Sequence, residues 1–254
     1  MCRIASYLGP AIPLENIVVS PRHSLLAQSQ NAAEGKLSVH GDGFGLAWYN
    51  QRSLQPGLFL DEHPAWADDN LAQLCRMVES KLFIAHVRAA NMGETSRQNC
   101  HPFAYGKWSF CHNGQIPHFP TIRRQLEANL PDDLYAARRG STDSEMLFLT
   151  LLAHGLDHDP VQALHRTIAD VSSGDVIHPV KLTCVFSDGQ SLYAFRYASR
   201  GPAPLLYVSG SLDNGGCAIA SEPLTGVSDG WDVIPQNVLF RLDEGGVETL
   251  AVAA

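Results

Sequence analysis

The order of strand-like and helix-like segments is the feature that most constrains the fold of this chain. Strand-like apolar runs lie at 3–8, 82–87 and 108–112, a cluster of helical patterns follows, and further strand-like runs are spread over 180–242. A doubly wound sheet would alternate strands and helices along the whole chain, whereas separate blocks are typical of α+β proteins. We therefore expect an α+β fold.

Capping patterns mark where helices begin. The range 68–79 carries apolar residues at i, i+3, i+4 and i+7 behind two aspartates, which suit the positive end of a helix dipole. Thr142-Asp143-Ser144-Glu145 has the pattern of a capping box and precedes the apolar run 146–152. The segment 20–26 predicts a capping serine, a first-turn proline and a short helix. These patterns predict a helix in each of the named ranges.

Three alternating glycines precede an apolar strand in His40-Gly41-Asp42-Gly43-Phe44-Gly45-Leu46. The stretch lacks the Gly-x-Gly-x-x-Gly and Gly-Lys-Ser/Thr patterns of a phosphate loop, and no helix signal follows it. Glycines at the start of a strand allow another backbone to approach closely. From the residues alone, this structural role and a functional one stay equally open.

Length and charge limit the kinds of partner. At 254 residues, the chain can bury the core of one large domain, 1–254, without disulfide or metal cross-links. A net charge of −8 without any basic run argues against nucleic acid or an anionic membrane as partner. No apolar stretch approaches the ~18 residues of a membrane span, and 1–20 lack a signal-peptide pattern, so we expect a cytoplasmic protein.

The cysteines and histidines show no metal-binding spacing. The six cysteines are widely separated without a Cys-x-x-Cys pair, and the eleven histidines include no His-Glu-x-x-His pattern. In a reducing cytoplasm this distribution predicts buried thiols rather than disulfides or a zinc site. We expect neither a metal nor an organic cofactor, although a His/Cys metalloprotein would fit the residue counts.

Cys2 is the candidate for a reactive thiol. If the initiator methionine is removed, as is usual before a small residue, Cys2 carries both a thiol and a free α-amine. The amine has a pKa of about 7.7–8.0 and the thiol one of about 8.5, so near neutral pH the amine can accept the thiol proton. One residue would then supply a nucleophile and its base. The alternative is a cysteine that merely starts the chain.

Other segments carry groups that could serve this nucleophile. Arg88 ends an apolar strand and presents paired donors that suit the α-carboxylate of an amino acid. Asn113 and Gly114 follow the strand 108–112, and a side-chain amide beside a glycine N–H suits a developing oxyanion. Asp143, in a first helical turn, could hold an α-ammonium group. Each also has a simpler structural reading, namely a surface ion pair, an Asn-Gly turn and a helix-dipole contact.

Taken together, these segments resemble a class II glutamine amidotransferase domain of the N-terminal-nucleophile hydrolase superfamily. The matching stretches occur in the family's order and cover nearly the whole chain. They are Met1-Cys2, Asp42-Gly43-Phe44-Gly45-Leu46-Ala47-Trp48-Tyr49, Ala85-His86-Val87-Arg88-Ala89, Cys100-His101-Pro102-Phe103, His112-Asn113-Gly114, Thr142-Asp143-Ser144-Glu145 and Ala220-Ser221-Glu222-Pro223-Leu224. Within the family, the chain is most similar to small stand-alone members such as the γ-glutamyl amidohydrolase of ergothioneine biosynthesis.

The resemblance implies a four-layer αββα sandwich, in which two antiparallel sheets are flanked by helices. It implies a catalytic set in which Cys2 is the nucleophile with its own amine as base, and in which Asn113 and Gly114 form the oxyanion hole. It also implies a substrate-binding set in which Arg88 binds the glutamyl α-carboxylate, Asp143 binds the α-amine and His101 lies beside the pocket. His86 and Ser221 are weaker candidates by the same comparison.

Two departures from the family pattern limit what can be transferred. Arg88 is followed by Ala89-Ala90-Asn91, whereas members with a fused synthase often carry Trp-Ala-Thr there, so the contacts of that Trp and Thr do not transfer. Ile4 stands where several ergothioneine-type members have His, which weakens the transfer of that particular substrate.

The expected reaction is hydrolysis of glutamine or a γ-glutamyl amide through a thioester on Cys2. Only some 30 residues follow the last matching motif, so a fused synthase domain is not expected. One alternative is a glutaminase subunit that supplies ammonia to a separate acceptor enzyme, and another is a non-catalytic γ-glutamyl-binding domain. The segments 50–66 and 199–216 are expected to shape the side of the leaving amine. An acceptor subunit and a homo-oligomer both stay open as partners.

Overall fold

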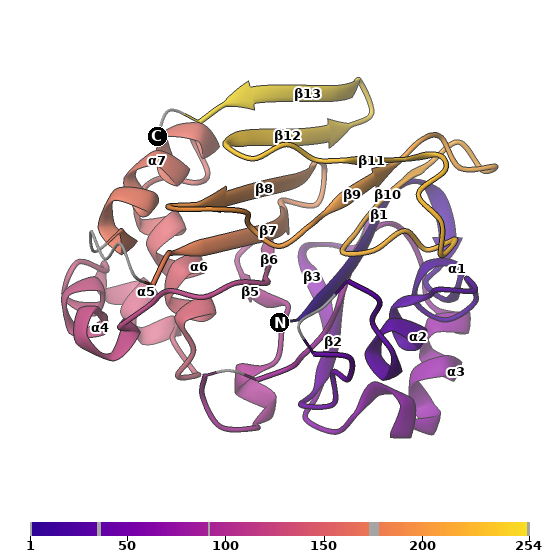
Figure 1. Cartoon of the computed structure of the whole chain (residues 1–254), viewed down its shortest axis with the longest axis horizontal. Coiled ribbons are helices and arrows are strands. Elements are labelled where there is room, and N and C mark those ends of the chain that lie inside the picture. The colour runs from indigo at the N-terminus through magenta and orange to yellow at the C-terminus, as the bar shows by residue number, and fades with distance from the viewer. Residues whose placement is uncertain (1, 35–36, 91, 173–177, 253–254) are drawn as a thin grey trace.

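The computed structural model describes residues 2–34, 37–90, 92–172 and 178–252, which contain two antiparallel β-sheets (Figure 1). One sheet has the strand order β11-β9-β10-β1-β4-β2-β3. Its members are β1 (Arg3–Pro13), β2 (Phe44–Asn50), β3 (Ser53–Asp61), β4 (Glu79–Val87), β9 (Tyr207–Ser209), β10 (Cys217–Ala220) and β11 (Trp231–Val233). The other sheet has the order β13-β12-β8-β7-β6-β5. Its members are β5 (Phe103–Tyr105), β6 (Trp108–His112), β7 (Lys181–Ser187), β8 (Leu192–Ala198), β12 (Val238–Asp243) and β13 (Gly246–Ala251).

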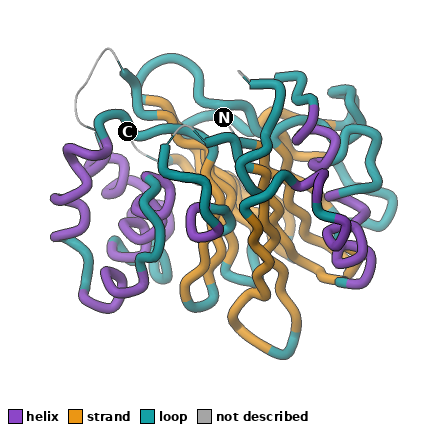
Figure 2. The backbone as a smooth tube through the Cα atoms, turned by 90° about the horizontal axis from the view of Figure 1, so that it is seen from below, coloured by secondary structure: helices purple, strands orange, loops and turns teal. Residues whose placement is uncertain are grey.

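Helices cover one face of each sheet (Figures 1 and 2). On the β1 sheet lie α1 (Glu15–Val18), α2 (Leu25–Gln30) and α3 (Asp69–Met77), while the β6 sheet carries α4 (Phe119–Ala128), α5 (Asp132–Ala137), α6 (Asp143–Ala153) and α7 (Pro160–Val171). Short 3₁₀ turns occur at Ala65–Ala67 and Arg97–Asn99. None of the helices in the described ranges has the length and apolarity needed to cross a membrane.

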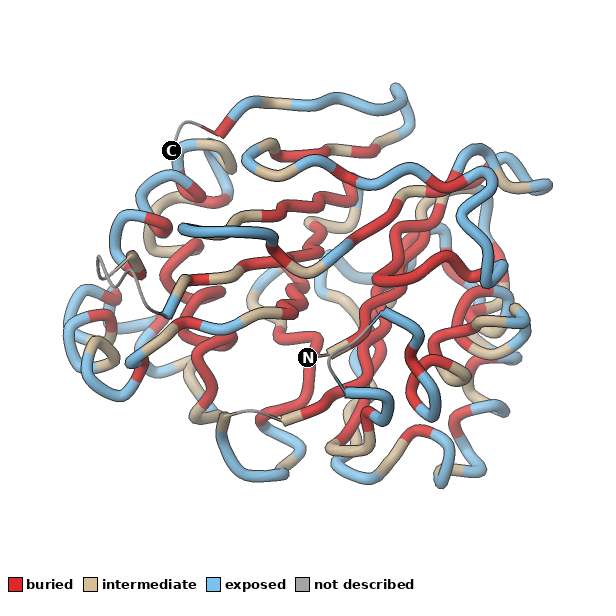
Figure 3. Tube along the Cα trace, in the orientation of Figure 1, coloured by how far each residue is buried: buried red, intermediate tan, exposed pale blue. Residues whose placement is uncertain are grey.

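Three apolar clusters fill the spaces between the layers. One joins α1–α3 to their sheet, a second joins α4–α7 to theirs, and the third lies between the sheets and includes Ile4, Ile84 and Val185. Figure 3 shows this as buried strands in the centre and exposed segments along the outside. Because burial of apolar surface is the dominant favourable term in folding, the three clusters hold the layers in this order. The structure confirms the expected αββα sandwich.

Most predicted helices and strands are present, with one helix start displaced. Thr142 caps α6 as expected, since its side chain accepts the N–H of Glu145, and Asp68, expected at the positive end of the helix dipole, also caps α3 by accepting the N–H of Asn70. The prediction that Ser20 caps the helix expected within 20–26 was wrong, because this helix, α2, begins at Leu25 behind the capping residue Ser24. The edge strands β3, β5, β11 and β13 were not predicted from the sequence. Both faces of β13 are largely exposed, so it lacks the alternation that marks a half-buried strand.

Strand direction gathers several chain segments at one end of the sandwich. Antiparallel pairing places Arg3, at the start of β1, beside Val87, at the end of β4, and Phe44, at the start of β2, also pairs with Val87. The residues just outside these strands therefore meet at the same end. β6 of the other sheet also reaches this end, because Asn113, the residue that follows β6, contacts Cys2.

Glycines 43 and 45 allow a close approach of the chain at this same end. A Cβ atom on Gly45 would lie 2.3 Å from the carbonyl oxygen of His101, and one on Gly43, whose φ is +113°, would lie 2.4 Å from Cys100 Sγ. Neither atom could be accommodated without moving the 100–101 segment. The structural role of these glycines is thus confirmed, and it also places His101.

Candidate active site

A small cavity of about 20 Å³ lies beside Cys2, between the two sheets' ends. Its wall consists of Cys2, the turn after β4, His101, the residues at the end of β6 and the first turn of α6. Five of the six residues predicted for the site line it, namely Cys2, Arg88, His101, Gly114 and Asp143. The sixth, Asn113, is fully buried and contacts Cys2 directly. The structure therefore brings together residues that are far apart in sequence.

Cys2 is held through its backbone at two points. Its N–H donates to Asn113 Oδ1 at 3.0 Å, and its carbonyl oxygen accepts from Arg3 Nη1 at 3.2 Å. The thiol lies 3.7 Å from the carbonyl oxygen of Ala89. Burial raises the pKa of this thiol, and the cationic side chains of Arg88 and Arg3 oppose that shift. A partly buried thiol with a raised pKa needs a nearby base to become a nucleophile.

The Asn113 side chain faces Cys2 with its oxygen and leaves its nitrogen free. Its backbone N–H and C=O pair with Thr183 at 2.8 and 3.1 Å, which fixes the residue just beyond the end of β6. The amide nitrogen Nδ2 is buried and has no hydrogen-bond partner among the residues that the structure describes. A buried donor without a partner is costly unless a ligand or transition state uses it. Asn113 is therefore suited to both roles, holding the Cys2 nitrogen and donating to an oxyanion.

Gly114 has no space for a side chain. A Cβ atom there would lie 1.9 Å from the carbonyl oxygen of Lys181 and 2.5 Å from His112 Nε2. Both neighbours are fixed, since Lys181 pairs through its backbone with Gln115 and His112 belongs to β6. Glycine is thus required for the packing of this turn, independently of any catalytic role.

Replacing Gly114 by alanine is expected to destabilise the protein by about 2–3 kcal/mol, because the added methyl group forces the Lys181 strand away. The measurement is the urea midpoint of purified G114A compared with that of the parent protein. Gly210 offers a matched control, because a Cβ atom there has its nearest neighbour at 3.7 Å. Equal midpoints for G114A and G210A would contradict the packing argument.

Arg88 is buried, and its guanidinium is surrounded by main-chain carbonyl groups. Nη2 donates to Met92 O at 2.9 Å and Gly93 O at 3.5 Å, while Nη1 donates to the carbonyl oxygens of Asp42 and Glu94, each at 3.3 Å. The Asp42 side chain in turn accepts the N–H of Ala90 at 2.8 Å. The simpler reading of Arg88, a surface ion pair, is therefore wrong. Its charge has no carboxylate partner among these contacts and lies at the cavity wall.

Asp143 lies in the first turn of α6. One of its carboxylate oxygens accepts a backbone N–H, and the other faces the Ser144 hydroxyl, which also contacts His112. Oδ2 accepts the N–H of Ile116 at 2.9 Å, and Oδ1 is 3.3 Å from Ser144 Oγ. Ser144 Oγ is closer to His112 Nδ1, at 2.9 Å. His112 Nε2 faces the Lys181 carbonyl at 3.3 Å and so carries a hydrogen.

The protonation state of His112 decides where the serine hydroxyl points. Burial lowers the pKa of His112, although Asp143 opposes the shift. In the neutral ring with hydrogen on Nε2, Nδ1 is an acceptor, so Ser144 donates to His112 rather than to Asp143. Oδ1 of Asp143 then keeps its capacity to accept from a substrate ammonium group. Ser144 and His112 thus fix each other beside Asp143. Neither was predicted from the sequence as a site residue, although both lie within the matched motifs.

His101 and His86 form a stacked pair behind the cavity. Their ring centroids are 4.2 Å apart, and in the described ranges neither ring nitrogen of His101 has a hydrogen-bond partner. Burial lowers the pKa of both rings well below the usual value, which keeps them neutral at neutral pH. His86 does not line the cavity, and Ser221 instead binds the N–H of Ile4 through Oγ at 2.9 Å. His86 and Ser221 therefore support other residues of the site.

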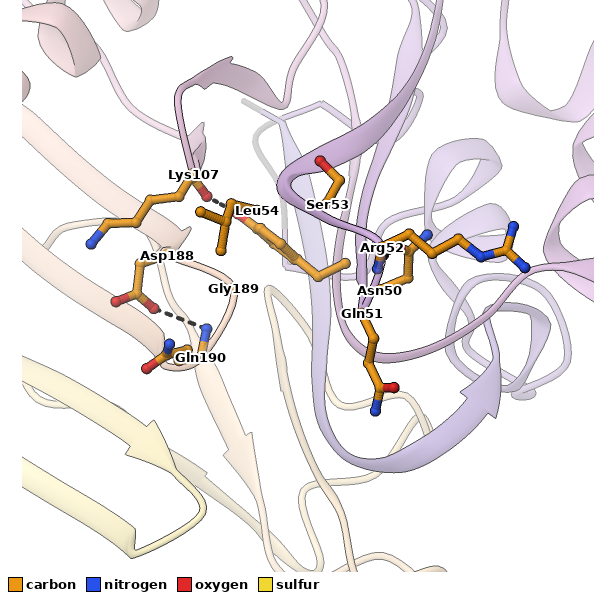
Figure 4. A pocket seen from close by; sticks show the side chains of 10 residues that line it. Asn50, Gln51, Arg52, Ser53, Leu54, Lys107, Asp188, Gly189 and Gln190 are labelled. Carbon is orange, nitrogen blue, oxygen red and sulfur yellow. Dashed lines mark hydrogen bonds between the residues drawn. The ribbon is translucent and has the colours of Figure 1, made fainter.

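The segments 50–66 and 199–216 contribute no described residue to the cavity wall. Their expected role on the side of the leaving amine stays a prediction, and strand pairing places only the β2–β3 turn, 50–53, at the opposite end of the sandwich. Part of that segment lines a separate surface hollow of about 370 Å³ between the β2–β3 turn and the β7–β8 turn (Figure 4). The Tyr49 hydroxyl beneath it is bonded to Lys107 O, Ser109 Oγ and Ser187 O, each at 2.9 Å.

Within the described ranges, no group of three or more His, Cys, Asp or Glu side chains is arranged to hold a metal ion. The described cysteines are all free thiols. The cavity residues offer a thiol, imidazole and hydroxyl groups, a carboxylate and a guanidinium group.

Comparison with known proteins identifies the family of the chain. The family model for class II glutamine amidotransferases matches residues 16–210. The chain is 31% identical to the probable glutamine amidotransferase DUG3 of Saccharomyces cerevisiae, over 95% of this chain and 82% of that protein. It is 27% identical to a gamma-glutamyl-hercynylcysteine sulfoxide hydrolase of Mycobacterium tuberculosis, over 99% of this chain and 97% of the relative.

A solved structure also matches along the full length. The glutamine aminotransferase class-II domain protein from Silicibacter pomeroyi superposes with a TM-score of 0.77 at 36% identity, and the match covers 100% of both chains. The family model covers well over half of the sequence, and the fold is the sandwich of two antiparallel sheets with outer helices. The chain therefore belongs to the class II glutamine amidotransferase family and is a hydrolase of that family.

Proposed function

We propose that the protein hydrolyses a γ-glutamyl amide, with Cys2 as nucleophile and its α-amine as general base once Met1 has been removed. The observation that carries the proposal is the arrangement around Asn113. Its oxygen binds the Cys2 nitrogen at 3.0 Å, while its buried nitrogen lacks a partner within the described part of the chain. A nucleophile with its base and an unused oxyanion donor thus occur side by side.

The first half of the reaction forms a thioester. The α-amine takes the thiol proton, and Cys2 Sγ bonds to the γ-carbonyl carbon of the substrate. The carbonyl oxygen becomes an oxyanion that accepts from Asn113 Nδ2 and the Gly114 N–H. When the C–N bond breaks, the Cys2 ammonium returns its proton to the departing amine. The enzyme then holds a γ-glutamyl group on sulfur.

The second half regenerates the enzyme. Water attacks the thioester carbonyl, the α-amine accepts a proton from that water, and the same donors stabilise the second oxyanion. Collapse breaks the C–S bond, returns the proton to sulfur and releases glutamate. Each step uses protons and atoms supplied by the substrate, water or Cys2.

Recognition of the glutamyl group is assigned to Arg88 and Asp143. A carboxylate accepts paired hydrogen bonds from arginine more strongly than neutral carbonyl groups do. The substrate α-carboxylate would therefore replace carbonyl groups of 92–94 on the Arg88 guanidinium, which are 2.9–3.5 Å away. The cavity of about 20 Å³ has room for roughly one water molecule, so substrate binding must widen it. Movement of the 92–94 carbonyl groups would provide both changes.

Labelling by a glutamine-mimicking diazo ketone tests the proposal. Such a reagent should modify Cys2 alone at one label per chain, in protein whose intact mass lacks Met1. Peptide mapping locates the label, and excess glutamate should slow the reaction. Labelling of another cysteine, or none in protein free of Met1, would contradict the proposal.

The alternative of ammonia supply to a separate acceptor enzyme has one supporting observation, the similarity to a relative described as a probable glutamine amidotransferase. Turnover by the isolated protein separates the two. Hydrolysis of γ-glutamyl amines without a partner supports the proposal, whereas ammonia release from glutamine only in a complex supports the alternative.

The reactivity of Cys2 should depend steeply on pH. Because burial raises the pKa of the thiol, the thiolate fraction should increase about tenfold per pH unit across the neutral range. The alkylation rate of Cys2 by iodoacetamide, followed by mass spectrometry between about pH 6 and about pH 9, should rise accordingly. A rate that is already constant at neutral pH would show that the thiolate forms more readily than its buried position implies.

A further inference from the structure

A buried ion pair lies directly behind the nucleophile and belongs to no role assigned so far. Arg3 Nε is 3.1 Å from Glu222 Oε1, and both side chains are at most 3% exposed. Arg3 also donates from Nη1 to the carbonyl oxygen of Cys2 at 3.2 Å. The pair thus links the first residues of the chain to the segment that follows β10.

The Glu222 carboxylate is bound on both oxygens. Oε1 accepts the N–H of Glu34 at 2.9 Å, while Oε2 accepts the N–H of Ala33 at 3.0 Å and is 2.6 Å from His23 Nε2. These contacts and the Arg3 cation lower the pKa of Glu222 despite its burial. The carboxylate therefore remains charged and rigidly placed, which makes it a fixed anchor for Arg3.

We propose that Arg3, anchored by Glu222, is a positioning residue that sets the orientation of Cys2 for catalysis; this rests on the function proposed above. An N-terminal residue has a chain on one side only, so its nitrogen and carbonyl must be fixed by other groups. Asn113 holds the nitrogen and Arg3 holds the carbonyl. Loss of the carbonyl contact lets the amine and thiol turn away from Asn113 and from the substrate carbonyl.

The neighbouring residue supports the same arrangement. Ser221 N donates to Ile4 O at 2.9 Å, and Ser221 Oγ accepts from Ile4 N at 2.9 Å. Ile4 is thus clamped on both backbone groups and Arg3 pairs with Val87 in the sheet, which leaves residue 2 as the adjustable part of this end of the described chain. The contacts of Arg3 decide how that part lies.

Arg3→Lys tests the proposal, because lysine keeps the charge but cannot reach Glu222 and the Cys2 carbonyl with the same planar group. We expect kcat to fall between about tenfold and about a hundredfold, the range expected for a misplaced reacting group, while KM stays within about twofold. Glu222→Gln should lower kcat similarly, and R3K/E222Q should be no slower than the slower single variant, since the two residues act as a unit.

Arg196→Lys is the matched control. Arg196 is also buried and donates to main-chain carbonyl groups of Ala203, Pro204 and Ile234, away from the cavity. All rates are expressed per chain that accepts the diazo ketone label, at a temperature where each variant is folded. Wild-type kcat in R3K on that basis, or an equal loss in R196K, would overturn the proposal.

The alkylation rate of Cys2 separates this test from that of the proposed function. If the wild-type protein turns over no γ-glutamyl compound, the proposed function fails, yet Cys2 alkylation by iodoacetamide can still be compared. R3K should then change this rate by at least about threefold relative to wild type, with R196K unchanged. Identical rates in all three proteins would reject the positioning role alone.

Discussion

Replacement of Cys2 by alanine is expected to lower turnover of γ-glutamyl amides by a factor on the order of 10⁴ or more, because no other group can form the thioester. Alanine is small enough to preserve removal of Met1, and the Cys2 side chain is only partly buried at the edge of the cavity. The thermal midpoint should therefore change by no more than about 2–4 °C. The measurements are kcat with a γ-glutamyl amine and a thermal melt.

Cys217→Ala provides the control for this prediction. Cys217 is a free and partly buried thiol on β10, outside the cavity. C217A should keep wild-type turnover and label normally with the diazo ketone, whereas C2A should not label at all. Residual activity in C2A within about a hundredfold of wild type would mean that catalysis does not depend on a covalent intermediate at this residue.

Replacement of Asn113 by alanine is expected to lower kcat by about 10²–10³, the usual cost of losing one oxyanion donor. The variant also loses the acceptor for the Cys2 nitrogen, so the effect should lie at the upper end of this range. KM should change little, because the groups assigned to the glutamyl end are Arg88 and Asp143. Steady-state kinetics on protein quantified by active-site label measures both constants.

Asn113→Asp separates the two roles of this side chain. Aspartate keeps an oxygen for the Cys2 nitrogen but replaces the donor Nδ2 by an acceptor, which repels an oxyanion. We expect N113D to lose at least as much kcat as N113A. Asn214→Ala, which removes an exposed amide bonded to the Tyr7 hydroxyl at 2.7 Å, should leave kcat unchanged. An N113D variant as active as wild type would place the oxyanion elsewhere.

The local sequence predicted the helices more completely than the strands. Caps at Asp68 and Thr142 and the apolar periodicity behind them are local signals, and both helices begin where expected. The edge strands β3 and β13 were missed because their side chains are mostly exposed and so lack an alternating pattern. β3 and β13 are strands because they pair with β2 and β12, and no pattern in their own residues predicts that pairing.

The candidate site was predicted residue by residue, but not its internal contacts. Cys2, Arg88, Asn113 and Asp143 could be identified because their motifs occur in the family's order. The hydrogen bonds from Arg88 to main-chain carbonyl groups could not be predicted, since they depend on the conformation of the turn after β4. The contacts of Glu222 could not be predicted for the same reason, although its segment matches a family motif.

The sequence by itself determined which groups the protein has for its chemistry: a thiol at the second residue, an Asn-Gly pair after a strand, and an arginine and an aspartate at element ends. These follow from local patterns of a few residues each. Only the tertiary structure decided how the groups are oriented, because the partners of Cys2 come from the end of β6 in the opposite sheet and, through Arg3, from the segment after β10. Strand pairing and the packing between the sheets set those distances, and both depend on the whole chain at once.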